Sequence, residues 1–433
     1  MTRGTQIGVF IVCLFLISPL AFSNGLNLNG LGSRAVAMGG AFTGLADDFS
    51  AMYWNPAGMA QIKRTTFGFF GFDVLPSMKY EFDMGLVNAK TETKNYLGGM
   101  AAYYHPINDR LVIGLSAFSP SGLGANWNGA DFAALTGGNV YQWSSKVAMI
   151  TFAPGIGYKV SDFLMIGASL NVNYAMFDLS RHAGMASDVL DLGQNTMSFT
   201  GWGVGATLGV LVKPSEIFSA GITFRTPVRV TFSGDTTVSG IGVLGQIPGT
   251  PLFGASIPTM SETDVKLTWP LYLAVGVAYR PMENLILTAD AQYTNWKKVD
   301  VLELQYTDSF WQLIMVPTGD NLFPLHWKDA IQLRFGAEYQ LSDSFALRGG
   351  YYHDPAPAPD DTMNVLLPSF NFNVVTFGIG YTMDGLSLNF GMEYLMGAER
   401  DIPYDPAKEA MPGMYTMNIW APSISIGYSW GNK

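Results

Sequence analysis

The sequence predicts an all-β membrane protein: a 14-stranded antiparallel transmembrane β-barrel with a small N-terminal plug, or hatch, inside its lumen. Apolar residues alternate with small or polar residues over most of the chain. Charged residues make up 13% of the chain, about half the share usual in soluble domains, and aromatic residues also reach 13%. After the N-terminus no stretch reaches the roughly 18 apolar residues that a spanning helix needs, so a membrane protein of this composition crosses as a closed barrel.

Residues 1–23 are predicted to be a secretory signal peptide. Arg3 supplies a positive start, residues 7–20 an apolar core, and Ala21-Phe22-Ser23 a cleavage site of the small-x-small type. The alternative is a spanning helix, but the apolar run is short and no stop-transfer pattern follows it. Because Cys13, the single cysteine, lies in this segment, the mature chain is expected to contain neither disulfides nor thiolate metal sites.

Residues 24–63 are predicted to form the plug. This stretch is apolar and glycine-rich, and neither helical nor alternating periodicity persists in it. The residue before a proline is disfavoured in the α region, so a short helix that uses Asp48 as its N-cap should end by Trp54. The turn sequence Asn55-Pro56-Ala57 follows.

Residues 64–433 are predicted to form the barrel itself. Between residues 271 and 279, large apolar residues occupy one face and small residues the other; between residues 331 and 339, the second face carries Gln332, Arg334 and Glu338. Fourteen such segments are expected, near 65–72, 96–106, 110–120, 146–158, 163–182, 198–212, 217–233, 263–280, 284–299, 326–341, 345–353, 370–383, 386–396 and 417–430. Short turns alternate with long loops between them, as in outer-membrane barrels and unlike a water-soluble β-sandwich, the competing fold.

The last segment resembles the terminal signal that the outer-membrane insertion machinery reads. Ile424, Ile426, Tyr428 and Trp430 share one face, although three further residues follow Trp430. The alternative is an ordinary amphipathic edge strand.

A break in the wall is predicted where the third segment ends. Pro120 cannot donate a backbone hydrogen bond and Gly122 weakens strand pairing, which favours a kink and a lateral opening. The alternative is a strand that simply ends in a turn.

Several strings in this order resemble the FadL family of outer-membrane transporters for long-chain fatty acids and, in its toluene-type branch, aromatic hydrocarbons. They are Gly30-Leu31-Gly32-Ser33-Arg34-Ala35, Ala46-Asp47-Asp48, Asn55-Pro56-Ala57, Phe224-Arg225-Thr226-Pro227-Val228, Leu267-Thr268-Trp269-Pro270, Tyr293-Thr294-Asn295-Trp296, Trp327-Lys328-Asp329-Ala330 and Arg348-Gly349-Gly350-Tyr351. The resemblance implies uptake by diffusion: a substrate lands among the outer loops, enters a lumenal pocket and leaves sideways through the wall. Loops 183–195 and 238–260 are rich in apolar residues and are candidates for the landing site, with packing against each other as the alternative.

A carboxylate in an apolar lumen needs a cationic donor. Parity places Lys328, Arg334 and Arg348 on inner faces, and Arg181 as well if its strand has no bulge. The resemblance points to Arg181 and Lys328 as headgroup contacts. Arg348 is a further candidate because parity places it on an inner face. The alternative is that these cations pair with lumenal acids such as Glu338.

Other functions find little support in the sequence. The four histidines have no short metal-ligand spacing, the net charge of -10 argues against nucleic acid as a partner, and no cofactor is expected. The strings Gly427-Tyr428-Ser429-Trp430-Gly431 and 240–245 match enzyme motifs, but neither is followed by the required helix. The chain is therefore not expected to be an enzyme. The remaining alternatives are a general solute porin or a surface adhesin on the same barrel, and an outer-membrane lipase that uses His182 or His326. The expected partners are a long-chain fatty acid or another hydrophobic small molecule, together with outer-membrane lipid and lipopolysaccharide.

Overall fold

The computed structural model describes residues 25–82, 85–184 and 191–431, so the predicted signal peptide lies outside the described residues. The strands form one closed antiparallel wall, in which β1 pairs with the last strand, from Thr65 opposite Trp430 onward. The wall strands are β1 (Thr65–Glu81), β3 (Tyr96–Pro106), β4 (Leu111–Trp127), β5 (Trp143–Lys159), β6 (Leu164–Gly184), β7 (Asp191–Ser215), β8 (Phe218–Arg225), β9 (Val228–Val238), β10 (Met260–Trp269), β11 (Tyr272–Met282), β12 (Leu285–Thr294), β15 (Ala330–Gln340), β16 (Phe345–Asp354), β17 (Phe372–Met383), β18 (Leu386–Gly397) and β20 (Gly413–Trp430). Because β8 with β9, and β10 with β11, each form one interrupted span, the wall is the predicted 14-stranded barrel.

The outward faces are apolar, as the alternation predicted. Leu273, Val275 and Val277 are exposed on β11, whereas Ala274 and Ala278 between them are buried. On β15, Gln332 and Arg334 are buried and face inward, while the neighbouring Leu333 is exposed. This division suits a barrel whose outer surface meets lipid.

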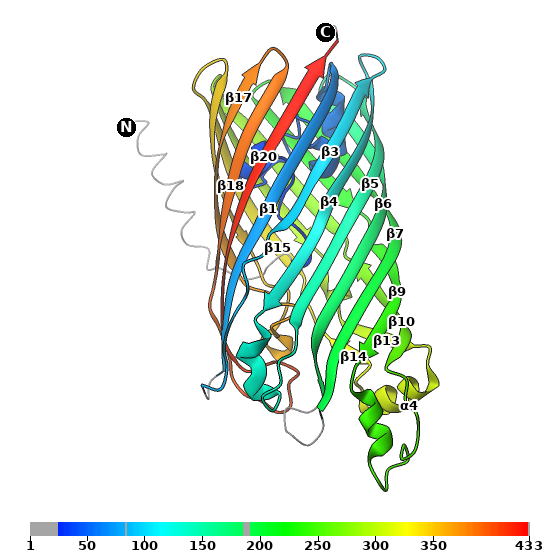
Figure 1. Ribbon diagram of the computed structural model, residues 1–433. Helices are drawn as coiled ribbons and strands as arrows, with labels where there is room; N and C mark the ends of the chain where they lie inside the picture. The colour runs from blue at the N-terminus through cyan, green and yellow to red at the C-terminus, as the bar shows by residue number, and fades with distance from the viewer. Residues whose placement is uncertain (1–24, 83–84, 185–190, 432–433) are drawn as a thin grey trace.

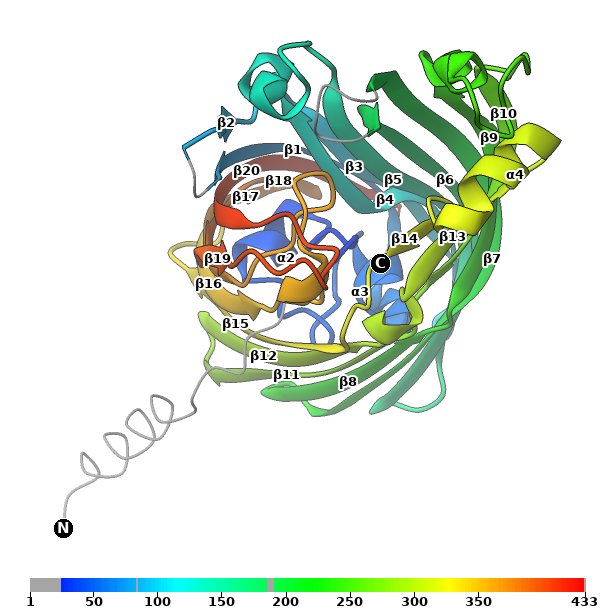
Figure 2. The ribbon, with the colours of Figure 1, turned by 90° about the horizontal axis from the view of Figure 1, so that it is seen from below.

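Two neighbouring spans are interrupted at the same height, which the sequence analysis did not predict. Val228 lies opposite Trp269 and Arg225 opposite Tyr272, so Thr226-Pro227 and Pro270-Leu271 face each other outside the strand ladder. The prolines cannot donate to a ladder, which explains the interruption. Beyond it β10 pairs with β13 (Val301–Tyr306) instead of β12, and β9, β10 and helix α4 (Ser309–Thr318) project from one side of the barrel (Figures 1 and 2).

Some strands are longer than predicted. β4 continues past residue 120 to Trp127. β6 extends to Gly184 and β7 begins at Asp191, so the described residues of the predicted loop 183–195 belong to these two strands; the structure does not describe residues 185–190. The remaining elements are short: β2 (Asn88–Lys90), β14 (Leu322–Pro324), β19 (Arg400–Ile402), η2 (Gly129–Leu135), η3 (Ile241–Gln246), η4 (Trp296–Lys298) and η5 (Asp360–Thr362). Among the described residues, no helix has the length and apolarity needed to cross a membrane.

Residues 25–62, here called the lumenal segment, lie inside the ring of strands, in the half of the barrel nearer the C-terminus (Figures 1 and 2). The segment contains α2 (Ser33–Ala37), α3 (Ala51–Trp54) and η1 (Pro56–Gln61). Helix α3 ends at Trp54 as predicted, but its N-cap residue is Ser50 and not Asp48; the Asp48 carboxylate instead accepts a hydrogen bond from the Ser50 backbone N–H at 2.8 Å.

Candidate functional site

The strand ladder between β3 and β4 stops partway up the wall. The last residues paired between these two strands are Met100 and Phe118. Beyond them β4 stays paired with β5, after a register shift between Phe118 and Ser121, and Thr91 forms an isolated bridge with Trp127 at its far end. Pro120 lies within this shift. At this point β4 bends and continues, so it does not end in a turn, and its edge facing β3 is left without that partner.

The start of the lumenal segment occupies the vacated edge of β4. The Leu28 N–H donates to the Pro120 carbonyl at 3.0 Å, and the Gly122 N–H donates to the Leu26 carbonyl at 3.1 Å. Asn27 and Ser121 face each other as an antiparallel bridge. Residues 26–28 thus act as a three-residue strand at the place where β3 has left β4.

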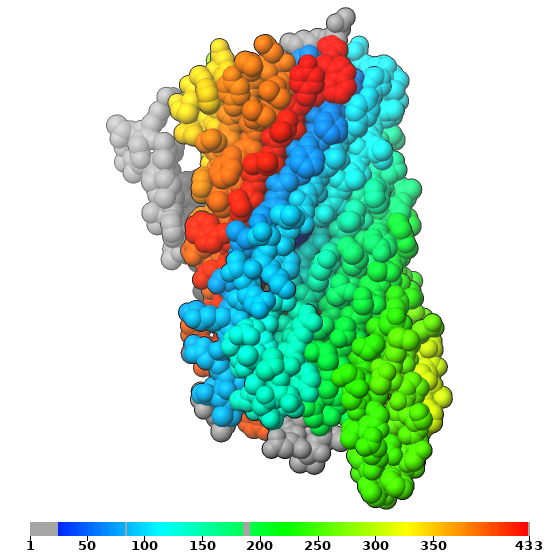
Figure 3. Space-filling view, in the orientation of Figure 1, coloured from blue at the N-terminus to red at the C-terminus, as the bar shows by residue number. Residues whose placement is uncertain are grey.

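A cavity of about 310 Å³ lies in the wall between these strands. Its lining is mostly apolar and comes from the lumenal segment and from β1, β3, β4, β5, β6 and β20. It includes Leu28, Phe72, Tyr96, Leu97, Gly98, Gly122, Leu123, Val147, Met149 and Ile150. Leu97, at its outer edge, is 79% exposed. On this face, the light blue and cyan surfaces of β1, β3 and β4 leave a small hollow (Figure 3). We call this the wall cavity.

The Asn55-Pro56-Ala57 turn attaches the lumenal segment to β7. The Asn55 side-chain amide donates to the Thr43 carbonyl at 2.9 Å and to the Val210 carbonyl of β7 at 3.0 Å, and its oxygen accepts from the Ala57 N–H at 3.1 Å. A Cβ at residue 209 would lie 2.1 Å from the Asn55 oxygen, so the close approach requires Gly209. Asn55 is fully buried and satisfies three backbone groups at once.

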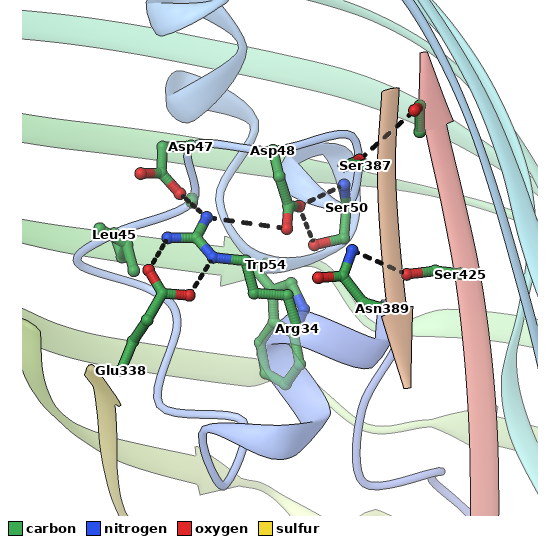
Figure 4. Close-up of polar contacts among 12 residues, drawn as sticks. Arg34, Leu45, Asp47, Asp48, Ser50, Trp54, Glu338, Ser387, Asn389 and Ser425 are labelled. Atoms are coloured by element: carbon green, nitrogen blue, oxygen red, sulfur yellow. Dashed lines mark hydrogen bonds and ion pairs between the residues drawn. The ribbon is translucent and has the colours of Figure 1, made fainter. Parts of the chain in front are cut away.

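An ion network joins the lumenal segment to Glu338 of β15 (Figure 4), and Glu338 in turn pairs with Arg348 of β16. Arg34 Nε and Nη2 donate to the Glu338 carboxylate at 2.7 and 2.9 Å, and Arg34 Nη1 donates to Asp47 at 2.5 Å. Arg348 Nε donates to Glu338 at 2.6 Å and its Nη1 to Asn389 at 2.8 Å. Burial disfavours a charged Arg34, but the carboxylates of Asp47 and Glu338 outweigh burial and hold the Arg34 pKa well above its ordinary value.

The three predicted headgroup residues lie apart. Arg181 is half-buried on the long β6, and its Nε has no hydrogen-bond partner among the described residues. Lys328 is exposed in the loop before β15, and its backbone N–H donates to the Pro357 carbonyl at 2.8 Å. Arg348 belongs to the ion network with Glu338, which is the pairing that the sequence analysis left open as an alternative.

Sequence analysis did not single out Arg225 as a site residue. Its guanidinium carbon lies 4.2 Å from the ring centre of Tyr53 and 4.3 Å from that of Tyr272, and Nη2 donates to the Tyr53 carbonyl. It lines a second cavity, of about 70 Å³, between the lumenal segment and the wall. A signal was present, because alternation places Arg225 on the same face as the buried Ser219 and Thr223.

Comparison with known proteins identifies a family to which the chain is similar. The family model described as "Outer membrane protein transport protein (OMPP1/FadL/TodX)" matches residues 14–429. The chain is 24% identical over 417 residues to the long-chain fatty acid transport protein of Escherichia coli O6:H1, covering 89% of this chain and 90% of that protein. It is 22% identical over 411 residues to outer membrane protein P1 of Haemophilus influenzae, covering 83% of each. Alkane uptake protein A of Marinobacter nauticus is 27% identical over 244 residues, which cover 52% of this chain and 50% of that protein.

Solved structures share the fold. A Pseudomonas aeruginosa FadL homologue superposes with a TM-score of 0.77 at 19% identity, covering 94% of this chain and 100% of that chain. The toluene transporter TodX of P. putida gives a TM-score of 0.73 at 17% identity, with the same coverage. The toluene transporter TbuX of Ralstonia pickettii gives 0.69 at 18% identity, again with 94% and 100% covered.

The matched relatives are outer-membrane proteins and the chain folds as a closed barrel, so it is an outer-membrane protein. Members of the matched family transport hydrophobic compounds across that membrane and are not known as enzymes. With the family model spanning nearly the whole sequence, the chain belongs to the OMPP1/FadL/TodX family of outer-membrane transport proteins.

Proposed function

We propose that the chain takes up hydrophobic compounds by passive diffusion, long-chain fatty acids ahead of aromatic hydrocarbons. In this proposal the substrate enters the lumen from the loop end and leaves sideways through the wall cavity, while residues 24–63 plug the direct path. The observation that carries the proposal is the apolar wall cavity, which lies where β3 leaves β4 and borders the exposed Leu97. The mostly apolar lining favours an acyl chain over an aqueous solute, because burial of each methylene is favourable by about 0.8 kcal/mol.

Capture would begin on the projecting part of the barrel. Loop 238–260 exposes Phe253 and Met260, with 61% and 52% of their surfaces accessible. Exposed apolar groups of this kind concentrate hydrophobic molecules near the entrance, close to outer-membrane lipid and lipopolysaccharide. Arg181 would contact a carboxylate inside the rim, because its Nε is buried and has no hydrogen-bond partner among the described residues. Lys328 would act nearer the surface, where it is exposed.

The exit would require residues 26–28 to leave the edge of β4. Two backbone hydrogen bonds, one bridge, a hydrogen bond from the Ser121 hydroxyl to the Asn27 side-chain oxygen at 3.3 Å and the buried Leu26 side chain hold them there. Hydrogen bonds of this kind contribute only about 1 kcal/mol each, so thermal motion or an arriving acyl chain can release them. Arg348 would take a substrate role only if its bonds to Glu338 and Asn389 opened first.

Uptake assays test the proposal. Cells that lack other carriers and express this chain should accumulate labelled oleate faster than cells with an empty vector, and labelled toluene serves as the hydrocarbon alternative. Liposomes that become permeable to sugars would instead support a general porin, and fatty-acid release from phospholipid would support a lipase. If neither oleate nor toluene accumulates above the vector control, the proposed function is wrong.

A further inference from the structure

The outer surface of the barrel has an apolar concavity on the side away from the wall cavity. Its volume is about 490 Å³, and its lining residues come from the neighbouring strands β7, β8, β11, β12 and β15. Figure 2 shows β8, β11 and β12 across the barrel from β1 and β3. Neighbouring strands lie about 4.8 Å apart, so the concavity extends roughly 19 Å around the wall. We call it the outer concavity.

Small side chains make the wall concave here. Ala220 and Ala289 are the register partners of Val277 on its two sides, and Ala291 is the next outward residue of β12. Phe335, the partner of Ala289 on β15, is 40% exposed and borders the concavity. Because side chains alternate along a strand, all these residues point away from the lumen, so the outer concavity opens towards lipid.

The outer concavity lies at the height of the hydrocarbon layer. Tyr279 is the next outward residue after Val277, towards a short turn, and Tyr293 is the next after Ala291, towards the long loop 295–329. Outward aromatic residues of this kind mark the two membrane interfaces of a barrel. The long loops of outer-membrane barrels lie on the cell exterior, so the Tyr293 end belongs to the outer leaflet.

Two exposed lysines, Lys297 and Lys298, follow at this outer end, just beyond β12. The Lys297 side chain is 65% exposed, and its ammonium lies 3.4 Å from the Asp329 carboxylate. That carboxylate also accepts hydrogen bonds from the Tyr293 hydroxyl and the Asn295 side-chain amide, each at 2.8 Å. Because an ammonium has three donors, Lys297 can contact a further anion while it keeps this pairing.

The facing stretch of chain carries further charges. The Trp327 N–H donates to the Val299 carbonyl at 3.1 Å, which brings the exposed Lys328 alongside Lys298. The Asp300 carboxylate lies 2.6 Å from His326 Nδ1. The surface above the outer concavity thus presents lysines that are exposed to solvent, whereas both nearby carboxylates already contact a donor.

We propose that the outer concavity, together with Lys297 and Lys298, is a docking surface for lipopolysaccharide, with acyl chains of its lipid A on the concavity and a phosphate at the lysines. The outer leaflet selects this lipid over phospholipid, and the breadth of the concavity suits several chains side by side. Lysine stems can lie along apolar surface while the ammonium reaches a phosphate. A lipid held here leaves the wall cavity uncovered, and the inference does not depend on which compound is taken up.

Native mass spectrometry of the purified full-length protein in detergent tests the charged end of this surface. The probes are hexa-acyl bisphosphoryl lipid A and dioleoyl phosphatidylethanolamine, with EDTA present so that metal ions do not bridge carboxylates to phosphate. We expect lipid A to bind at least roughly tenfold tighter than the phospholipid, and K297Q/K298Q to weaken lipid A binding roughly tenfold. The matched control is K79Q/K90Q, which removes two exposed lysines that are register partners on β1 and β2. It should leave lipid A binding unchanged.

A second pair of variants tests the apolar end. A289L/A291L fills the outer concavity and should weaken lipid A binding roughly fivefold. A337L/G349L adds the same side chains at outward positions of β15 and β16 outside the concavity, and should have no effect. The thermal unfolding midpoint of each variant shows whether the barrel remains folded.

Three results would overturn the proposal. The first is equal affinity of the unaltered protein for lipid A and for phosphatidylethanolamine. The second is an equal loss of lipid A binding in K297Q/K298Q and K79Q/K90Q, which would mean that any exposed lysine pair attracts the lipid. The third is unchanged lipid A binding in A289L/A291L.

Discussion

The two parts of the lumenal segment are held in the barrel very differently. Residues 33–62 are bound to the wall by buried side-chain contacts, above all those of Arg34 and Asn55. Residues 26–28 contact β4 through two backbone hydrogen bonds and one side-chain hydrogen bond, from the Ser121 hydroxyl to Asn27, and Leu28 lines the wall cavity. In the proposed route the first part would act as a fixed stopper and the second as a removable cover, so passage of a substrate would not have to expel the plug.

The largest effect is expected from locking the cover. N27C/S121C places two cysteines at the antiparallel bridge, in a chain whose only other cysteine, Cys13, lies in the predicted signal peptide. Oxidation should reduce oleate uptake by roughly a hundredfold, to the vector level, because residues 26–28 can no longer leave β4. Reduction with dithiothreitol should restore uptake.

The matched control for this lock is S121C/M149C. Ser121 and Met149 are register partners on β4 and β5, so this pair crosslinks the same residue without tethering the lumenal segment. It should leave uptake intact under oxidation. Undiminished uptake in oxidised N27C/S121C would show that the cover does not have to move.

Removing the carboxylate that joins Arg34 to Arg348 tests the fixed part. Breaking a buried charge network by deleting one member costs about 3 kcal/mol, so E338Q should lower the thermal unfolding midpoint of the purified barrel. Oleate uptake should remain within about twofold of the parent, because the ion network lies outside the proposed route. E283Q, in an exposed turn, is the control that should change neither quantity. Loss of uptake at unchanged stability would place the network on the substrate path.

A smaller effect is expected from the Asn55 turn. N55A leaves the Thr43 and Val210 carbonyls and the Ala57 N–H without their partner, which should cost about 2 kcal/mol in a thermal or urea unfolding measurement. N418A removes an exposed asparagine from β20 and should be neutral. Equal stability of the two variants would contradict the anchoring role of Asn55.

The smallest effect is expected from narrowing the wall cavity. A Cβ at Gly122 would meet the Leu28 side chain at 3.7 Å, an ordinary contact distance, so G122L should fold and fill part of the cavity. Uptake of oleate should slow roughly threefold, because the cavity is reduced but not closed. G349L adds the same side chain on the distant β16, where space is also available. An equal slowing in both variants would argue against the wall cavity as the route.

Much of the barrel could be predicted because successive residues of a strand point to opposite faces, so the two environments alternate in the sequence. Leu273 is large, apolar and exposed on the outer face, whereas its neighbour Ala274 is small and buried. The interruption in β4 could be predicted at Pro120, because a proline has no backbone N–H to donate to a neighbouring strand. Contacts that join distant parts of the chain carry no such signal. Strand parity allowed a pairing of Arg348 with Glu338, but neither the participation of Arg34 in it nor the position of residues 26–28 over the break could be foreseen. Parity also failed to locate Lys328, because the chain turns at His326, with a φ of 49°, before β15 begins.

The most direct test of lateral exit is photocrosslinking with a long-chain fatty acid that carries a photoreactive group at its tail. The barrel is labelled in nanodiscs and the attached peptides are mapped by mass spectrometry. The proposal predicts crosslinks at residues 96–98 and 119–124, around the wall cavity, and their loss in oxidised N27C/S121C. Crosslinks that instead follow the lumen to the short turn at 342–344, and survive the oxidation, would contradict lateral exit.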